Sequence, residues 1–502
     1  MTLLSIEIAE LLGRARDLLI YDSSAPLIFN SGLFLFLFVG FMGIYLRLRS
    51  ATSLRLLYVI AFSLYFYYKS SGIYFLLLLF ASVSDYWIGF AIAASTDKVA
   101  RKQLVALSVL INLGMLAYFK YTNFFIEMAN GVMGAGFLDF KNIFLPVGIS
   151  FFVFQSMSYT IDIYRGQIRP LERWSDYLFY LSFFPQLVAG PIVRAKDFIP
   201  QIRQPLMVTR EMFGTGICFI IGGLIKKAII SDYISLNFVD RIFDEPALYS
   251  GFECLMGIYG YALQIYCDFS GYSDMAIGIA LLLGFRFPKN FDAPYKSATI
   301  TEFWRRWHIS LSSWLRDYLY ISLGGNRRGT LRTYLNLIIT MVLGGLWHGA
   351  AVRFILWGAL HGVALALHKV WMAVVPNAKS KGSDMSPIMR VLGIVLTFHI
   401  VCLGWLLFRA EDMHTVHLML YQILHSCNLS IIPQFMVGYK EVMALICLGY
   451  FMHFMPSAID ADLQRKVGGA SFWWQVAMLV VVAWCVMQIK SSSIQPFIYF
   501  QF

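Results

Sequence analysis

The chain has 502 residues, of which 59% belong to the hydrophobic set and only 14% are charged, whereas soluble domains carry about 25% charged residues. This composition excludes an ordinary soluble protein and indicates a lipid environment. The net charge of +11 does not indicate a nucleic-acid partner, because the basic residues gather in short loops between apolar stretches, as in the cytoplasmic loops of membrane proteins.

Apolar stretches of the length needed to cross a bilayer, about 20 residues, recur along the whole chain. They predict an all-α integral membrane protein with about eleven to thirteen transmembrane or re-entrant helices. Residues 2–20 mix charged and apolar side chains, so we expect an interfacial amphipathic helix there and no cleavable signal peptide. We expect residues 1–490 to form one membrane domain, followed by an aromatic tail over residues 491–502.

The stretch Leu181–Pro191 does not fit a simple membrane span. Pro185, Gly190 and Pro191 interrupt it, and the backbone groups that they leave unpaired are not tolerated in lipid. We therefore expect this stretch to be buried in protein or to line a cavity.

Two carboxylates, Asp268 and Asp274, lie in an apolar run of membrane-spanning length. A charge at that depth costs roughly 2.5 kcal/mol or more, so both should face the protein interior. Pairing with arginines or helix N-termini is the structural interpretation. Both residues also remain candidates for a functional pocket.

The segment Thr301–Tyr320 has apolar residues at helical spacing and predicts one helix at the membrane interface. His308 falls on its apolar face and should point toward protein. Taken alone, such a histidine is more often a core residue than a catalyst. This segment belongs to the most basic part of the chain, which we expect to face the cytosol.

A second histidine, His348, follows a glycine pair in the almost wholly apolar stretch from Tyr334 to Val352. The glycines predict a helix break or a close approach of backbones. An ionisable residue inside a membrane is a functional candidate, and a neutral imidazole suits general acid–base chemistry. A hydrogen bond across helices is the competing interpretation.

Several motifs occur together in one order: FFPQLVAGPIVR at Phe183–Arg194, YCDFSGYSDMAIG at Tyr266–Gly278, FWRRWHISLSSWLRDYLYI at Phe303–Ile321, GGNR at Gly324–Arg327, GGLWHG at Gly344–Gly349 and WGALHG at Trp357–Gly362. This series resembles the membrane-bound O-acyltransferase family, in the bacterial branch that contains alginate and peptidoglycan O-acetyltransferases and the D-alanyl transferase of teichoic acid synthesis. The resemblance implies a ring of helices around a central catalytic tunnel.

The resemblance also implies roles for particular residues. The family's invariant histidine corresponds to His348, and its second catalytic position corresponds to His308. One imidazole would take the acceptor proton while the second polar group orients the acyl carbonyl or stabilises its oxyanion. His361 could line the same cavity, although an interhelical hydrogen bond is the favoured interpretation. The residues that we expect near the tunnel or pocket are Trp347, Asp268, Asp274, Trp304, Arg305, Ser310 and His361.

The chain ends in the aromatic tail FIYFQF, which resembles the F-x-Y-x-x-F motif of the small membrane partner in D-alanyl transfer systems. There the tyrosine accepts an acyl group, which makes Tyr499 a candidate acyl relay. An aromatic tail at the end of a membrane protein is otherwise an interface anchor.

The resemblance predicts an O-acyltransferase in the bacterial cytoplasmic membrane. It would move an acyl group, expected to be acetyl, from acetyl-CoA or an acyl-carrier-protein thioester toward an extracytoplasmic polysaccharide or peptidoglycan. An extracytoplasmic esterase-like partner protein would complete the transfer. We expect no metal and no permanently bound cofactor, because the seven cysteines and the histidines show no metal-ligand spacing. The rival interpretations are a transporter or flippase, and a scaffold subunit of a polysaccharide-secretion complex.

Overall fold

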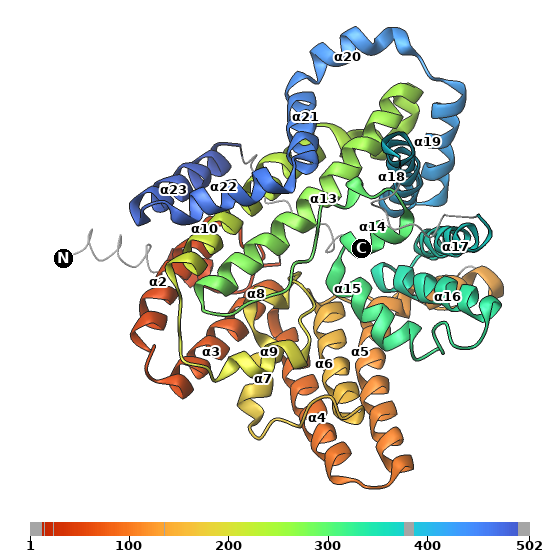
Figure 1. Cartoon of the computed structure of the whole chain (residues 1–502). Coiled ribbons are helices and arrows are strands. Elements are labelled where there is room, and N and C mark those ends of the chain that lie inside the picture. Colours follow the sequence, from red (N-terminus) through yellow and green to blue (C-terminus); the bar gives the residue numbers. More distant parts are fainter. Residues whose placement is uncertain (1–12, 15, 24, 135, 376–385, 490–502) are drawn as a thin grey trace. The chain divides into compact units, whose positions relative to one another are not determined.

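The computed structural model describes residues 13–489 except residues 15, 24, 135 and 376–385 (Figure 1). This part of the chain consists of helices and loops and contains no strand. By length and composition, five of its helices can cross a membrane, or up to seven if each of two bent helix pairs is one span. The prediction of an all-α integral membrane protein is confirmed. The other segments that the sequence suggested are shorter, broken or more polar helices.

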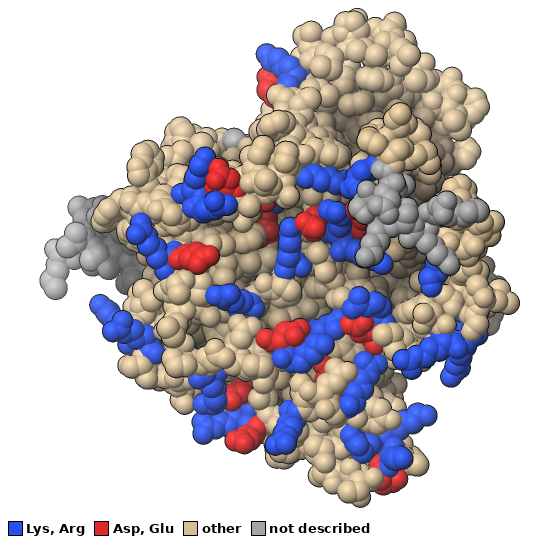
Figure 2. All heavy atoms as spheres, in the orientation of Figure 1, with Lys and Arg blue, Asp and Glu red and all other residues tan. Residues whose placement is uncertain are grey.

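The five spans are Thr52–Ala94, Lys98–Met133, Arg210–Asp244, Val352–Val374 and Pro387–Arg409. On the face that Figure 2 presents, charged side chains stand in separate groups within a largely uncharged surface.

The described residues separate into two compact units. Unit 1 runs to Met207 and includes Leu283–Phe285, and unit 2 contains the rest. The single domain predicted for residues 1–490 stays a prediction, and the tail 491–502 lies outside the described residues. The helices of unit 1 are α2 (Gly32–Arg47), α3 (Thr52–Ser71), α4 (Phe75–Ala94), α5 (Lys98–Met133), α6 (Ile149–Tyr164), α7 (Trp174–Ser182), α8 (Phe184–Leu187) and α9 (Ala195–Ile202).

The core of unit 1 forms around the stretch Leu181–Pro191. Phe184 contacts the rings of Phe34, Phe41, Phe62 and Phe66 at centroid distances of 5.1 to 6.3 Å. The whole stretch is buried. Its burial in protein, which the proline and glycine positions predict, is confirmed.

Unit 2 holds the candidate site. Its helices are α10 (Arg210–Leu224), η2 (Ile225–Ser231), α11 (Asp232–Ile234), η3 (Ser235–Val239), α12 (Asp240–Asp244), α13 (Gly251–Leu282), α14 (Ile300–Arg306), α15 (Ile309–Trp314), η6 (Leu315–Tyr320), α16 (Thr330–His348), α17 (Val352–Val374), α18 (Pro387–Arg409), α19 (Met413–His425), α20 (Ile432–Gly438), α21 (Lys440–Phe454), α22 (Ser457–Gly469) and α23 (Phe472–Ile489). Their order can be followed from yellow-green to blue in Figure 1.

Glycines let the central helices of unit 2 approach closely. A Cβ atom added to Gly223 on α10 would lie 2.5 Å from the carbonyl oxygen of Gly271 on α13. Gly216 on α10 and Gly278 on α13 make a second close contact between the same two helices. Small residues of this kind allow backbones to touch, which is how membrane helices gain packing energy.

Candidate active site

His308 lies at a break between two helices. The sequence predicts one helix over Thr301–Tyr320, but α14 ends at Arg306 and α15 begins at Ile309. His308 has φ 41° and ψ 57°, a left-handed conformation that is uncommon for residues other than glycine. The continuous helix is therefore wrong, and the residue that interrupts it is the histidine itself. Such backbone strain costs about 1–3 kcal/mol and is most frequent at functional sites.

The side chain of Asn290 compensates for this conformation. Its Oδ1 accepts hydrogen bonds from the backbone N–H of Ser310 (3.2 Å) and from Ser310 Oγ (2.8 Å), and it lies 3.1 Å from Nδ1 of His308. Its Nδ2 donates to Ser273 Oγ on α13 at 3.0 Å. All four residues are buried, so these hydrogen bonds fix the histidine relative to α13.

This arrangement also fixes the tautomer of His308. An amide oxygen only accepts hydrogen bonds, so the proton of the neutral ring must sit on Nδ1. Nε2 then carries the lone pair and can accept a proton. A neutral His308 in this tautomer is suited to accept a proton or a hydrogen bond, rather than to donate one to an oxyanion.

His348 is the last residue of α16 and is 4% exposed. Three aromatic rings surround it edge-on: Trp347 at 4.9 Å, Trp357 at 5.0 Å and Phe408 at 5.2 Å. The ring of Trp347 also contacts the ring of His308, at 6.3 Å. Two histidines that are forty residues apart in sequence therefore share one tryptophan neighbour in an aromatic environment.

The glycine pair before His348 brings α16 and α17 together. A Cβ atom on Gly345 would lie 2.1 Å from the carbonyl oxygen of Phe354, and one on Gly358 would lie 2.3 Å from that of Met341. The close backbone approach that the sequence predicts is confirmed. It places Trp357 of α17 against His348 at the end of α16.

His361 lies one turn beyond Trp357 on α17 and is fully buried. Its ring stands 4.9 Å from Trp357 and 5.1 Å from Trp304. Within the described part of the chain neither of its ring nitrogens has a hydrogen-bond partner, so the interhelical hydrogen bond favoured from the sequence is absent there. The indole N–H groups of Trp304 and Trp357 likewise have no acceptor among the described residues. Buried polar atoms of this kind usually find a water or ligand partner.

Asp268, which is buried, and Asp274, which is partly exposed, have partners other than those expected. Lys227 donates to Asp268, and to Asp232 at 2.7 Å, while Lys226 donates to Asp274 at 2.6 Å. Their pairing inside the protein is confirmed, but the cations are neighbouring lysines rather than arginines or helix N-termini. The lysines come from the π-helical segment η2. These ion pairs join η2 to α13, which favours the structural interpretation of both aspartates.

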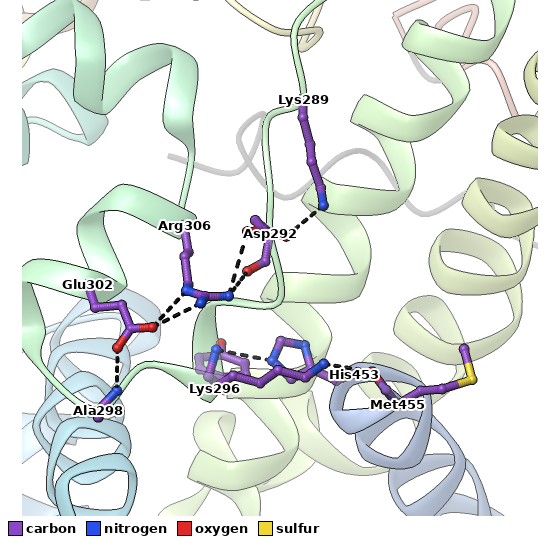
Figure 3. A network of polar contacts seen from close by, with 9 residues as sticks. Lys289, Asp292, Lys296, Ala298, Glu302, Arg306, His453 and Met455 are labelled. Atoms are coloured by element: carbon purple, nitrogen blue, oxygen red, sulfur yellow. Dashed lines mark hydrogen bonds and ion pairs between the residues drawn. The ribbon is translucent and has the colours of Figure 1, made fainter. Parts of the chain in front are cut away.

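Arg305 is exposed, and its place near the tunnel or pocket stays a prediction. Its neighbour Arg306 instead holds the loop that carries Asn290 (Figure 3). Arg306 pairs with Glu302 at 2.9 Å and with Asp292 at 3.6 Å, and Lys289 pairs with Asp292 at 2.6 Å. The hydrogen bond from Lys289 lowers the pKa of the Asp292 carboxyl. Two further contacts anchor the same loop to the end of α21: Lys296 donates to the Met455 carbonyl (Figure 3), and the Tyr295 N–H donates to His453.

Sequence reasoning missed Asn290, Phe269 and Phe408. Phe269 contacts His308 edge-on at 4.5 Å. No periodic pattern identifies a single asparagine in an irregular loop, and the two phenylalanines look like ordinary core residues. Tyr499 lies outside the described residues. Among the described residues, no group of three or more His, Cys, Asp or Glu side chains is arranged to hold a metal ion.

Comparisons with known proteins identify the family to which the chain belongs. Residues 173–408 match the model of the membrane-bound O-acyltransferase family. The chain is 37% identical to "Probable alginate O-acetylase AlgI" of Pseudomonas putida, over 95% of this chain and 100% of that protein. It is 35% identical to "Peptidoglycan O-acetyltransferase" of Helicobacter pylori, over 78% of each chain. It is 30% identical to "Teichoic acid D-alanyltransferase" of Bacillus subtilis, over 55% of this chain and 71% of that protein.

The fold and the comparisons together define a multi-pass membrane protein that is an O-acyltransferase. The chain belongs to the membrane-bound O-acyltransferase family. Both histidines of the candidate site, and His361, lie within the residues that match the family model.

Proposed function

We propose that this enzyme transfers an acetyl group from a cytosolic thioester donor across the bacterial cytoplasmic membrane, toward an extracytoplasmic polysaccharide or peptidoglycan. The similarity to proteins named for alginate and peptidoglycan O-acetylation supports acetyl as the acyl group and a glycan as the final acceptor. Acetyl-CoA and an acyl-carrier-protein thioester are the candidate donors. An extracytoplasmic esterase-like protein that passes the group to the sugar is the proposed partner.

The observation that carries this proposal is the pair of buried histidines that share Trp347. In the proposed reaction, a hydroxyl oxygen attacks the thioester carbonyl while His348 takes the hydroxyl proton. The new C–O bond forms, the C–S bond breaks, and the proton passes from His348 to the departing thiolate. The aromatic surroundings of His348 support this role because they keep water away from the thioester.

The surroundings of His308 suggest a separate role for it. Since Asn290 holds the proton on Nδ1, the Nε2 lone pair of His308 can accept a hydrogen bond from an N–H or O–H group of a substrate other than the reacting hydroxyl, and can thereby orient that substrate. The developing oxyanion then needs other donors. The buried indole N–H groups of Trp304 and Trp357, which have no acceptor among the described residues, are candidates for binding it.

A transporter or scaffold without its own chemistry is the alternative to an enzyme, and consumption of the donor separates the two. The enzyme in lipid nanodiscs should release free thiol from an acetyl thioester in the presence of an acceptor hydroxyl. A transporter would move the acyl group without breaking the thioester. Mass analysis of the host glycan, with and without the protein, then identifies the transferred group and the acceptor. Intact donor and an unchanged glycan would contradict the proposal.

A further inference from the structure

A pocket at the surface of unit 1 lies outside the candidate active site. Its volume is about 500 Å³, within the usual range for small-ligand sites. The loop after α6 and the helix α9 form its walls. Its charged lining residues are Arg169, Glu172, Arg173, Asp176, Lys196 and Arg203.

The basic residues of this pocket are of two kinds. Arg203 is neutralised by Asp176 through two hydrogen bonds of 2.6 and 2.7 Å, which also raise the pKa of Arg203. By contrast, no carboxylate among the described residues forms an ion pair with Arg169, Arg173 or Lys196. Glu172 is the other carboxylate of the lining, so the side chains outside the Arg203–Asp176 pair carry a net positive charge, and an anionic ligand would stabilise this arrangement of exposed side chains.

The backbone adds to this positive field. The helices α7 and α9 begin at this pocket, at Trp174 and Ala195, and neither has a side-chain cap at its N-terminus; their first turns contain Asp176, which pairs with Arg203, and Asp197. The first N–H groups of a helix carry a partial positive charge and commonly bind phosphate. Guanidinium groups add planar, bidentate donors that match phosphate oxygens.

The position of the pocket indicates the source of the phosphate. Trp174 and Tyr164, which border the loop after α6, are 39% and 37% exposed, as aromatic residues at headgroup level are. Arg101 donates to the carbonyl oxygen of Tyr164 at 2.9 Å, which joins this loop to the basic start of α5. Such basic loops are typical of the cytosolic leaflet, where anionic lipids gather.

We propose that this pocket binds the phosphate of an anionic phospholipid headgroup at the cytosolic surface. The guanidinium groups of Arg169 and Arg173 and the ammonium group of Lys196 hold the phosphate oxygens. The acyl chains of the lipid remain in the bilayer beside unit 1. The site is independent of the acyl-transfer chemistry and anchors unit 1 to the membrane surface.

Binding of phosphatidylglycerol to delipidated protein in neutral detergent, counted by native mass spectrometry, tests this proposal. The double variant Arg169→Gln/Arg173→Gln should bind the lipid at least about tenfold more weakly, since it loses two charged contacts. The matched control is Lys98→Gln/Lys102→Gln, which removes the same charge from exposed positions at the start of α5, outside the pocket. The control should retain near wild-type affinity.

Three outcomes would overturn the proposal. If both double variants weaken binding equally, only the general surface charge attracts the lipid. If inorganic phosphate or coenzyme A displaces the lipid at equal concentration, the pocket serves a soluble phosphate. The single variant Lys196→Gln keeps both arginines and replaces the double variant in the test if the double variant does not fold. If Lys196→Gln binds the lipid as tightly as wild type, the pocket is not the site.

Discussion

Asn290 is the residue on which the geometry of His308 depends. It accepts the hydrogen bonds of Ser310 and His308 with one oxygen atom and is itself held by Ser273. Nothing in its sequence context singles it out, because its role arises from a loop that folds back over α13. The tautomer of His308 follows from this one contact.

The variant Asn290→Ala should therefore lower acyl transfer by at least about tenfold, because His308 loses its fixed tautomer and orientation. It should also cost about 1–3 kcal/mol of stability, since buried donors lose their acceptor. Thiol release over a range of pH is the measurement. A purely structural role would lower the amount of folded enzyme and leave the shape of the pH profile unchanged.

Tyr499 has two candidate roles, acyl relay and interface anchor. As an acyl relay it needs its hydroxyl, whereas as an interface anchor it needs only its ring. The variant Tyr499→Phe should abolish glycan acetylation while the protein stays in the membrane. Full acetylation by this variant would show that the tail is an anchor.

Glycines position the candidate site because they let two helices pack with their backbones in contact. Gly345 lies against the backbone of α17, whereas a Cβ on the adjacent Gly344 would meet only Leu315 Cδ1, at 3.1 Å. The two positions differ in little else, so they form a matched pair.

Gly345→Ala should separate α16 from α17, move His348 away from Trp357, and destabilise the protein by about 1–3 kcal/mol or more. Gly344→Ala should be tolerated, because a single leucine methyl group can shift. Thermal unfolding and thiol release of both variants test this. Equal behaviour of the two would mean that the close contact does not position His348.

The elements also show what the sequence could and could not predict. The length of the apolar stretches predicted membrane spans, and the glycine pair predicted a close contact between helices. The prolines and glycine of Leu181–Pro191 predicted a buried segment. Each of these features follows from local chemistry. The break at His308 could not be predicted, since its left-handed backbone depends on Asn290 from another loop. The lysine partners of Asp268 and Asp274 were missed because Lys226 and Lys227 lie in an apolar run, and a π-helical turn directs them.

The orientation of the whole protein in the membrane decides the direction of acyl transfer. The arginine-rich loops around Arg305–Arg306 and Arg327–Arg328 give the strongest orientation signal and should face the cytosol. Single cysteines placed in these loops, on a cysteine-free background, should react with a membrane-impermeant reagent only after the cytosolic side is opened. Labelling from the outside alone would reverse the proposed direction.

The proposed acyl transfer depends on His348 as its proton acceptor. The most direct test is the rate of thiol release from an acetyl thioester by purified enzyme, compared between wild type, His348→Ala and the control His399→Ala. His399 is an exposed histidine of α18, whose contacts within the described part of the chain are with Tyr259 and with Phe398 and the Val395 carbonyl of its own helix. We predict that His348→Ala remains folded and inserted but loses about 10²–10⁴-fold in rate, while His399→Ala retains wild-type activity. A His348→Ala enzyme that releases thiol at the wild-type rate would contradict the role of His348 as the proton acceptor.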